Sequence, residues 1–458
     1  MANEEVVPRI DKRRDLTSGS IIKNIWYLAL PLMVGSLLQD AFSVVDMLFV
    51  GRLGPASIAA VAMAGIILGL VMIATMGIGA GTVAIVARFV GAKDFEGADY
   101  ATAQSLFMGI ICSLGVAFIG YFLAEPLLKI LGAKPEVVIL GGSYLKIIFI
   151  GSFTIFIFIL LAFSLRGAGD VLTPTKALIL ATFLNIVLDP LFIFGIWIFP
   201  RMGVAGSSLA TVISRAVGMI YLIRVFFAKK SVLHLSLKKL KVDFSMMGRI
   251  IKIGVFSSLE MLMRNLSGLV IIRFVAIYGT FAVAAYGIGM RLMMIAMMPG
   301  FGIAQSSATL VGQNLGAGKP DRAAKSAWLA AGFYGIIMAC LSTVYILFPH
   351  FLISLFNTNP RVLEIGAEFL NFISFGFVFM ALAIVLARAM GGAGDTITPM
   401  VITGICLFAV RIPLIVVFSQ LMNLATRGLW IGMLISTIVQ SLIIVFWFSR
   451  GKWKYKKV

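Results

Sequence analysis

The sequence predicts an all-α polytopic membrane protein with twelve transmembrane helices, and three observations support this fold class. The 458 residues are 60% hydrophobic and 12% charged, with a mean hydropathy of +1.05, whereas a soluble protein carries about twice that charged fraction. Apolar runs of about 20 residues, long enough to cross a ~30 Å hydrocarbon core, recur along the whole chain. Sequence motifs also return at one fixed spacing, which predicts two parallel six-helix repeats.

The spans follow one another with short turns marked by glycine, proline or charge. Their expected ranges are 25–50, 58–82, 100–123, 139–163, 176–199, 204–227, 249–277, 283–309, 326–348, 366–388, 400–420 and 429–449. The chain accordingly divides into an N-terminal segment 1–24, a first lobe 25–227, a linker 228–248, a second lobe 249–449 and a basic tail 450–458. The linker alternates apolar and basic residues, which is typical of an amphipathic segment at the membrane interface.

The net charge of +19 is distributed unevenly along the chain. With the N-terminus in the cytoplasm, 26 Lys and Arg lie on the cytoplasmic side, seven on the outer side and five within spans. This positive-inside pattern predicts a multi-pass protein of the cytoplasmic membrane with both termini cytoplasmic. The tail is expected to meet anionic lipid headgroups, and no nucleic-acid partner is expected.

Two motifs return 225 positions later in the chain. LRGAGDVLTP (165–174) is repeated as MGGAGDTITP (390–399), and VARFVGAKD (86–94) returns less closely as VGQNLGAGK (311–319). Because six crossings bring each half back to its starting side, the halves are parallel repeats, an arrangement of alternating-access transporters. The Gly-Ala-Gly-Asp turns are interpreted as structural, with glycine permitting a tight loop and Asp capping the next helix.

Acidic side chains lie within several predicted spans, where a carboxylate is costly unless it faces a cavity, is paired or takes up a proton. Asp46 in the first span has Ser43 and Gln39 before it on about the same face. Asp189 in the fifth span lies at a similar depth, one turn beyond Asn185. Two carboxylates and an amide at one depth suit a proton or Na⁺. The alternative is that Asn185 and Asp189 only tie their helix to a neighbour.

The order of these features resembles the multidrug and toxic compound extrusion (MATE) transporters. The resemblance is carried by ALPLMVGSLLQDAFSVVDMLFVGRLG in the first span, VGAKD and VGQNLGAGKP after the second and eighth, the paired GAGD…TP loops, and NIVLDP before the end of the fifth. It covers nearly the whole chain and implies two six-helix lobes around a central cleft. It also implies export of mostly cationic amphipathic molecules in exchange for inward H⁺ or Na⁺.

The resemblance further assigns a coupling site to the first lobe. The acids that match Asp46 and Asp189, with the amide that matches Asn185, form this site in the family. A hydroxyl from the sixth span often joins them, and Ser207 and Thr211, one turn apart, are both candidates.

The second repeat lacks this polar set. At the 225-residue spacing the three proposed coupling residues correspond to Ile271, Val410 and Leu414, and the tenth span carries acids only at its outer end, Glu364 and Glu368. The sequence therefore predicts a coupling site in the first lobe and none in the second.

Other polar and thioether side chains are candidates for coupling or substrate contact. Glu260 matches an acid that some MATE branches use in transport, but Arg264 follows at the spacing of an intrahelical ion pair, and both interpretations stay open. Asp40 lies close to mid-depth, where the family usually has a neutral polar residue. A stripe of soft thioethers that could repack around varied ligands, or simply pack the helix, comprises Met290, Met294 and Met297. The same group of candidates includes Gln39 and Ser43.

The predicted function is secondary active antiport, with H⁺ or Na⁺ as the coupling ion and no other cofactor. Ion uptake in the first lobe would move the first helix, with a bend near Pro31, and rocking of the lobes would return the site inward. The expected partners are a cationic amphipathic substrate and membrane lipids, and the chain is expected to act as a monomer.

Three alternatives to this function would require other residues or another architecture. A flippase for a lipid-linked sugar would use basic cleft residues, for which Arg215, Arg264 and Arg273 are candidates. An integral-membrane enzyme would need an Asp-rich metal motif or a catalytic His in a loop, and the sequence has neither. A channel is disfavoured because the duplication favours exchange.

Overall fold

The computed structural model describes residues 15–228, 231–234 and 241–456, and within these ranges every regular element is a helix. The first lobe consists of α1 (Ile21–Gly51), α2 (Pro55–Gly91), α3 (Phe95–Ile130), α4 (Pro135–Ile150), α5 (Ser152–Gly167), α6 (Leu172–Phe194) and α7 (Val204–Phe227). The second lobe begins with α8 (Phe244–Ala276), α9 (Thr280–Gly316), α10 (Pro320–Leu347), α11 (Pro349–Ser354), α12 (Pro360–Phe375) and α13 (Phe377–Gly392). It ends with α14 (Ile397–Gly404), the π-helical η2 (Ile405–Val410), α15 (Arg411–Val416), the π-helical η3 (Val417–Leu421), α16 (Ala425–Ser449) and the 3₁₀ turn η4 (Lys452–Tyr455).

Ten helical segments are long and apolar enough to cross a membrane, and two bent pairs bring the number to twelve. α4 and α5 form one bent span, and α12 and α13 form the other, with angles of 53° and 51°. The bends fall at Gly151 and Gly376, which are 225 positions apart. Hydropathy did not predict them because one glycine does not interrupt an apolar run. The predicted twelve-helix, two-repeat fold is confirmed.

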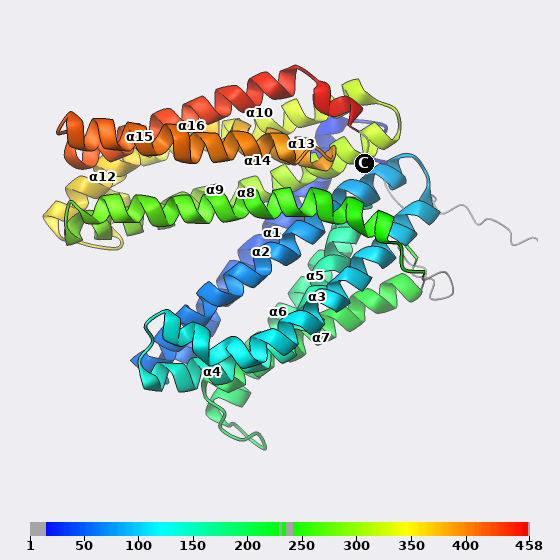
Figure 1. Ribbon diagram of the computed structural model, residues 1–458, viewed down its shortest axis with the longest axis horizontal. Helices are drawn as coiled ribbons and strands as arrows, with labels where there is room; N and C mark the ends of the chain where they lie inside the picture. Colours follow the sequence, from blue (N-terminus) through cyan, green and yellow to red (C-terminus); the bar gives the residue numbers. More distant parts are fainter. Residues whose placement is uncertain (1–14, 229–230, 235–240, 457–458) are drawn as a thin grey trace, which may run out of the picture.

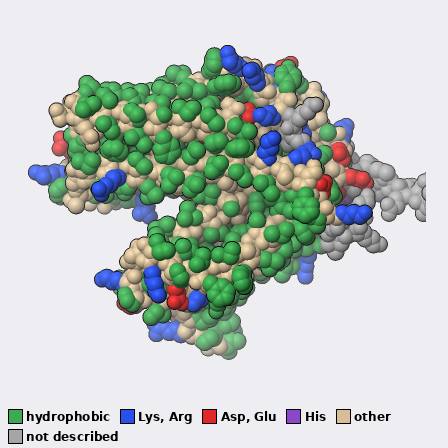
Figure 2. Space-filling view, viewed as in Figure 1, with side chains coloured by type: hydrophobic (Ala, Val, Ile, Leu, Met, Phe, Trp, Pro, Cys, Tyr) green, Lys and Arg blue, Asp and Glu red, His purple; other side chains and the backbone are tan. Residues whose placement is uncertain are grey.

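The two lobes meet at one end of the molecule and separate at the other. The helices of the first lobe (blue to green in Figure 1) diverge from those of the second, and the first and last described residues lie at the end where the lobes meet. The space-filling view shows the surface hollowed between the lobes, and this cleft opens on the side away from the termini (Figure 2). Helices α1 and α2 pack against α8 and α9 to join the lobes.

Glycines let the helices of the two lobes approach closely where they cross. A Cβ built at Gly77 of α2 would lie 2.6 Å from the carbonyl oxygen of Gly254 on α8. The equivalent crossing joins α9 and α1, where a Cβ at Gly302 would lie 2.8 Å from the carbonyl oxygen of Ala29. Gly77 and Gly302 are 225 positions apart, as are Ala29 and Gly254. Both repeats therefore place glycine at the same point of the inter-lobe contact.

A second symmetric contact lies at the ends of α2 and α9. A Cβ at Gly91 would overlap the backbone of Gln313, and a Cβ at Gly316 would overlap the backbone of Arg88. The side-chain amide of Gln313 also donates to the carbonyl oxygen of Gly167 at 2.9 Å. The lobes thus meet here through direct contact of their main chains.

The Gly-Ala-Gly-Asp loops have the structural form that the sequence predicts. Gly169 has φ +87° and Gly394 has φ +88°, a region that favours glycine. The carboxylate of Asp170 accepts a hydrogen bond from the backbone N–H of Thr173 at 3.1 Å, which caps the start of α6.

The π-helical turn η2 shifts the register between the repeats by one residue. The loop after α6 is closed by a hydrogen bond from Met202 N–H to Phe192 O at 2.9 Å, and the loop after η3 by one from Leu424 N–H to Phe418 O at 3.2 Å. A Cβ at Gly206 would contact Phe192, as one at Gly428 would contact Phe418. Phe192 and Phe418 are 226 positions apart, because a π turn holds one more residue than an α turn.

This shift corrects two counterparts that the sequence spacing predicts. Asn185 corresponds to Arg411, one residue beyond Val410, and Asp189 corresponds to Ile415, one residue beyond Leu414. A uniform spacing of 225 could not reveal the insertion, because the residues of η2 itself are all apolar.

Several predicted segments fall partly outside the described residues. These are the N-terminal segment 1–24, the amphipathic linker 228–248 and the basic tail 450–458. Where the linker is described, α8 begins at Phe244, and Asp243 caps it by accepting from the N–H of Ser245 at 2.8 Å. Helix α1 runs without a break through Pro31.

Candidate functional site

Four of the predicted coupling residues come together between α1, α6 and α7. The hydroxyl of Ser207 on α7 donates to Asp46 Oδ1 on α1 at 2.6 Å. On α6, Asn185 Nδ2 donates to Asp189 Oδ1 at 3.1 Å. The carboxyl groups of Asp46 and Asp189 are themselves within hydrogen-bonding contact. Residues up to 161 positions apart therefore form one polar cluster.

This cluster is shielded from solvent. Asp189 and Ser207 are 0% exposed and Asn185 is 3% exposed, whereas Asp46 is partly exposed. Asp189 Oδ2 is buried without a conventional donor. Two carboxyl groups in contact at a buried site cannot both be ionised without a cation or a shared proton between them. The arrangement can thus hold one H⁺ or one small cation.

Tyr144 on α4 is a neighbour of this cluster that the sequence did not reveal. Its ring is buried, and its hydroxyl is close enough to interact electrostatically with both Asp46 and Asp189. Within the predominantly apolar α4, a tyrosine gives no charge signal. Its counterpart 225 positions later is Phe369, so a comparison of the repeats would have shown a hydroxyl present in one lobe only.

Helix α6 ends little more than one turn beyond the acid it carries. Pro190 lies inside the helix and has no N–H to donate to the preceding turn. The helix ends when Gly195 adopts φ +70°, five residues before the predicted span ends. Asp189 therefore lies in the last two turns of α6, where Pro190 leaves one backbone carbonyl without its helical donor.

Other predicted residues lie apart from this cluster. Gln39 and Asp40 are exposed on α1, and the Ser43 hydroxyl donates to the carbonyl oxygen of Gln39 within the same helix at 3.1 Å. Thr211 is partly buried one turn beyond Ser207, and of the two candidate hydroxyls Ser207 is the one that bonds to Asp46.

Glu260 and Arg264 form an ion pair within α8. Arg264 Nη2 lies 2.7 Å from Glu260 Oε1, and the hydroxyl of Thr403 on α14 lies 3.4 Å from the same oxygen. The structure places these two residues as an intrahelical pair with a partner on a neighbouring helix, away from Asp46 and Asp189.

The methionines of α9 line a cavity in the second lobe. The cavity has a volume of about 190 Å³, and its wall includes Met290, Met293 and Met297. Met294, which the spacing placed in the stripe, is 65% exposed and lies outside the lining. The lining methionines follow an i, i+3, i+7 pattern, which fits the 3.6-residue turn as well as the predicted pattern does.

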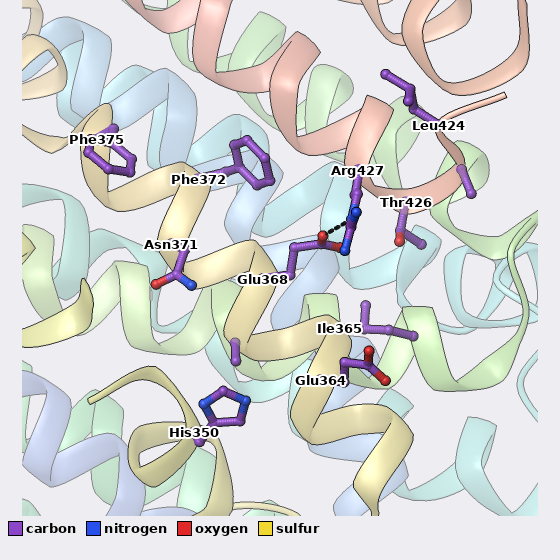
Figure 3. A pocket seen from close by; sticks show the side chains of 12 residues that line it. His350, Glu364, Ile365, Glu368, Asn371, Phe372, Phe375, Leu424, Thr426 and Arg427 are labelled. Atoms are coloured by element: carbon purple, nitrogen blue, oxygen red, sulfur yellow. Dashed lines mark hydrogen bonds and ion pairs between the residues drawn. The ribbon is translucent and has the colours of Figure 1, made fainter. Parts of the chain in front are cut away.

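A larger pocket of about 680 Å³ lies at the end of the second lobe away from the termini, between α12 and the start of α16 (Figure 3). Glu368 forms an ion pair with Arg427 across it, and Glu364 and His350 also line it (Figure 3). The pocket holds the two outer acids that the sequence assigned to the tenth span.

Arg215 and Arg411 lie within predicted spans and contact neutral groups in the described part of the chain. Arg215 lies 5.2 Å from the centre of the Phe158 ring, which is a cation–π contact. Arg411 donates from Nε to the Ser436 hydroxyl at 2.8 Å and from Nη2 to Thr437 Oγ1 at 3.3 Å.

A duplicated twelve-span fold with a cleft between lobes and a buried acidic cluster defines a membrane transporter. The profile of the MatE family matches residues 31–191 and 257–417, one match in each repeat. The chain belongs to the MatE family, and the resemblance to MATE transporters is confirmed.

Curated relatives match over almost their whole length. The chain is 28% identical over 443 residues to "Probable multidrug resistance protein YoeA" of Bacillus subtilis (strain 168), covering 96% of both chains. It is 29% identical over 442 residues to "Probable multidrug resistance protein NorM" of Thermotoga maritima, covering 96% of this chain and 94% of the relative. The solved "Crystal structure of MATE in the bent conformation" superposes with a TM-score of 0.89 at 25% identity, covering 95% and 96% of the two chains.

Proposed function

We propose that the protein is an antiporter that exports amphipathic small molecules, organic cations among them, in exchange for inward H⁺ bound in the first lobe. The observation that carries this proposal is the contact between the carboxyl groups of Asp46 and Asp189, of which Asp189 is fully buried. The names of the relatives as multidrug resistance proteins support the substrate class.

A proton fits this cluster better than Na⁺ does. Two carboxyl groups in hydrogen-bonding contact need one proton on the pair, and a proton needs no further oxygen ligands. Asn185 directs its N–H, not its carbonyl oxygen, toward Asp189. Na⁺ would need several oxygen ligands around it, as hard cations do. The geometry therefore supports H⁺ as the coupling ion.

The location of the cluster connects protonation to the movement of the lobes. Helix α1 packs against both α6 in the first lobe and α9 in the second. The contacts of Asp46 with Ser207 and Asp189 hold α1 to α7 and α6 within the first lobe. A change in the charge of the pair changes how strongly α1 is held, so one protonation state favours one arrangement of the lobes.

Proteoliposomes that carry the purified protein and ethidium test this function. The pH and Na⁺ gradients are imposed separately, and ethidium movement is followed by fluorescence. We expect the pH gradient to drive transport and the Na⁺ gradient at constant pH to drive none. Asp46→Asn and Asp189→Asn are expected to lose gradient-driven transport, whereas Glu364→Gln, an acid of the outer pocket, keeps it.

Two results would contradict the proposal. Full proton-driven transport by both asparagine variants would remove the acidic pair from coupling. Transport driven by Na⁺ alone would assign the cluster to a different ion.

A further inference from the structure

The cavity of the second lobe occupies the position that the acidic cluster occupies in the first lobe. Once the one-residue shift at η2 is included, Asp46 corresponds to Ile271 and Asn185 to Arg411, and both counterparts line this cavity. Asp189 corresponds to Ile415, which is fully buried. Duplication and divergence have thus left two equivalent sites, one with two carboxylates and one with a guanidinium.

Arg411 has no acidic partner among the described residues. Its guanidinium is held by two neutral hydroxyls, those of Ser436 and Thr437 on α16. A charge inside a membrane span that is held only by neutral groups is costly, and such residues mark binding sites and ion pathways. The hydroxyls orient the guanidinium beside the cavity without neutralising it.

The other charged groups near the cavity leave an excess of positive charge. Arg264 lines the cavity and is close enough to Arg411 to repel it, and its own partner is Glu260. Arg388 on α13 is close enough to interact with Glu260 and Arg264. Three guanidinium groups are therefore balanced by one carboxylate, so an anion in the cavity would be attracted.

The rest of the wall is apolar and adaptable. Thioether side chains line the cavity from α13 and α16 as well as from the α9 stripe, and the lining includes Met290, Met293, Met297, Met380 and Met433. Methionine repacks around ligands of different shape at little cost. A cavity wall that is mostly apolar, with positive charge at one side, suits an amphipathic anion and not an inorganic ion.

We propose that this cavity binds the carboxylate end of an amphipathic molecule, with the carboxylate on Arg411 and the apolar chain against the methionines. The proposal rests on the antiport function and deepens it, because it adds carboxylates to the molecules that the protein takes up. The cavity would thus prefer anions, whereas the family resemblance implies organic cations as substrates.

Matched amphiphiles of equal chain length test this proposal. Octanoate and octylammonium are titrated separately into the full-length protein in phosphatidylcholine nanodiscs, and affinity is measured from the shift of the melting temperature. We expect octanoate to stabilise the protein more than octylammonium does. Arg411→Gln is expected to bind octanoate at least about tenfold more weakly, as the loss of a charge-assisted hydrogen bond implies.

Control variants keep the result interpretable. Arg411→Lys retains the charge and is expected to retain part of the affinity, which separates loss of binding from misfolding. Arg427→Gln removes a guanidinium of the outer pocket and is expected to leave octanoate binding unchanged. Asp189→Asn is expected to lose proton-driven transport and keep octanoate binding, so failure of the antiport function and failure of this proposal give different results.

Three outcomes would overturn the proposal. Octylammonium could bind as tightly as octanoate, or Arg411→Gln could bind octanoate within twofold of the unaltered protein. The octanoate effect could also disappear in phosphatidylglycerol nanodiscs, which would identify an anionic lipid headgroup as the occupant.

Discussion

Replacing Gly77 by alanine is expected to shift the protein away from the arrangement in which the cleft opens opposite the termini. The new Cβ would lie 2.6 Å from the carbonyl oxygen of Gly254, whereas ordinary contact begins at 3.4 Å. Helices α2 and α8 would have to separate by about 0.8 Å, and overpacking of this kind costs about 1–3 kcal/mol. Because the penalty falls on the arrangement in which these helices cross closely, its population falls by a factor of about 5–150.

Distances between the outer ends of the lobes measure this shift. Nitroxide labels at Lys134→Cys, between α3 and α4, and at Thr358→Cys, between α11 and α12, report the opening by double electron–electron resonance. The native cysteines, Cys112, Cys340 and Cys406, are first replaced. We expect the long-distance population to decrease in Gly77→Ala and in its counterpart, Gly302→Ala.

Gly332→Ala on α10 is the matched control, because a Cβ there meets open space. An unchanged distance distribution in Gly77→Ala, with the protein folded, would refute the reasoning. So would an equal shift in the control, since that would show a general effect of alanine on helix stability.

Three further predictions concern single side chains. Ser207→Ala removes the donor to Asp46 and is expected to slow proton-driven efflux about tenfold, whereas Thr211→Val is expected to leave it near normal; equal effects would contradict the assigned contact. Gly169→Ala places a side chain at φ +87° and is expected to lower stability by about 1–2 kcal/mol, read from thermal unfolding, with unchanged transport per folded molecule. Arg264→Gln breaks a partly exposed ion pair with Glu260, so we expect a loss of no more than about 1 kcal/mol in the same unfolding assay, and a loss several times larger would show that the pair has a greater role.

The sequence predicted the number of spans, their order and the duplication, because apolar runs and repeated loops are local signals. The predicted range 204–227 coincides with α7. The bends at Gly151 and Gly376 were not predicted, since hydropathy averages over a window that contains both halves of a bent span. The short helix α11 was also missed, because it is only six residues long.

The candidate cluster was predicted less completely. Asp46 and Asp189 stand out because charge is rare in a span, and Asn185 follows from helical spacing. Ser207 and Thr211 lie one turn apart on the same face, so spacing could not separate them, and only the packing of α7 against α1 does. Tyr144 carries no charge and was overlooked.

The counterpart of Asn185 in the second repeat could not be identified from the sequence for a different reason. Its identity depends on a one-residue insertion that the π-helical turn absorbs within a continuous helix. A fixed spacing predicts an apolar residue there, and the structure places Arg411 instead. Conformation, and not residue type, sets the register in this part of the chain.

The contact between Gly91 and the backbone of Gln313, with its symmetric partner at Gly316 and Arg88, has a consequence for how such a protein can evolve. A Cβ at either glycine would overlap the facing main chain, so this junction requires glycine at two positions and makes no demand on the residues of the cleft wall. Mutations that change the cleft wall can therefore accumulate without altering this contact between the lobes. The contact between the lobes can be inherited unchanged while the residues that line the cleft diverge.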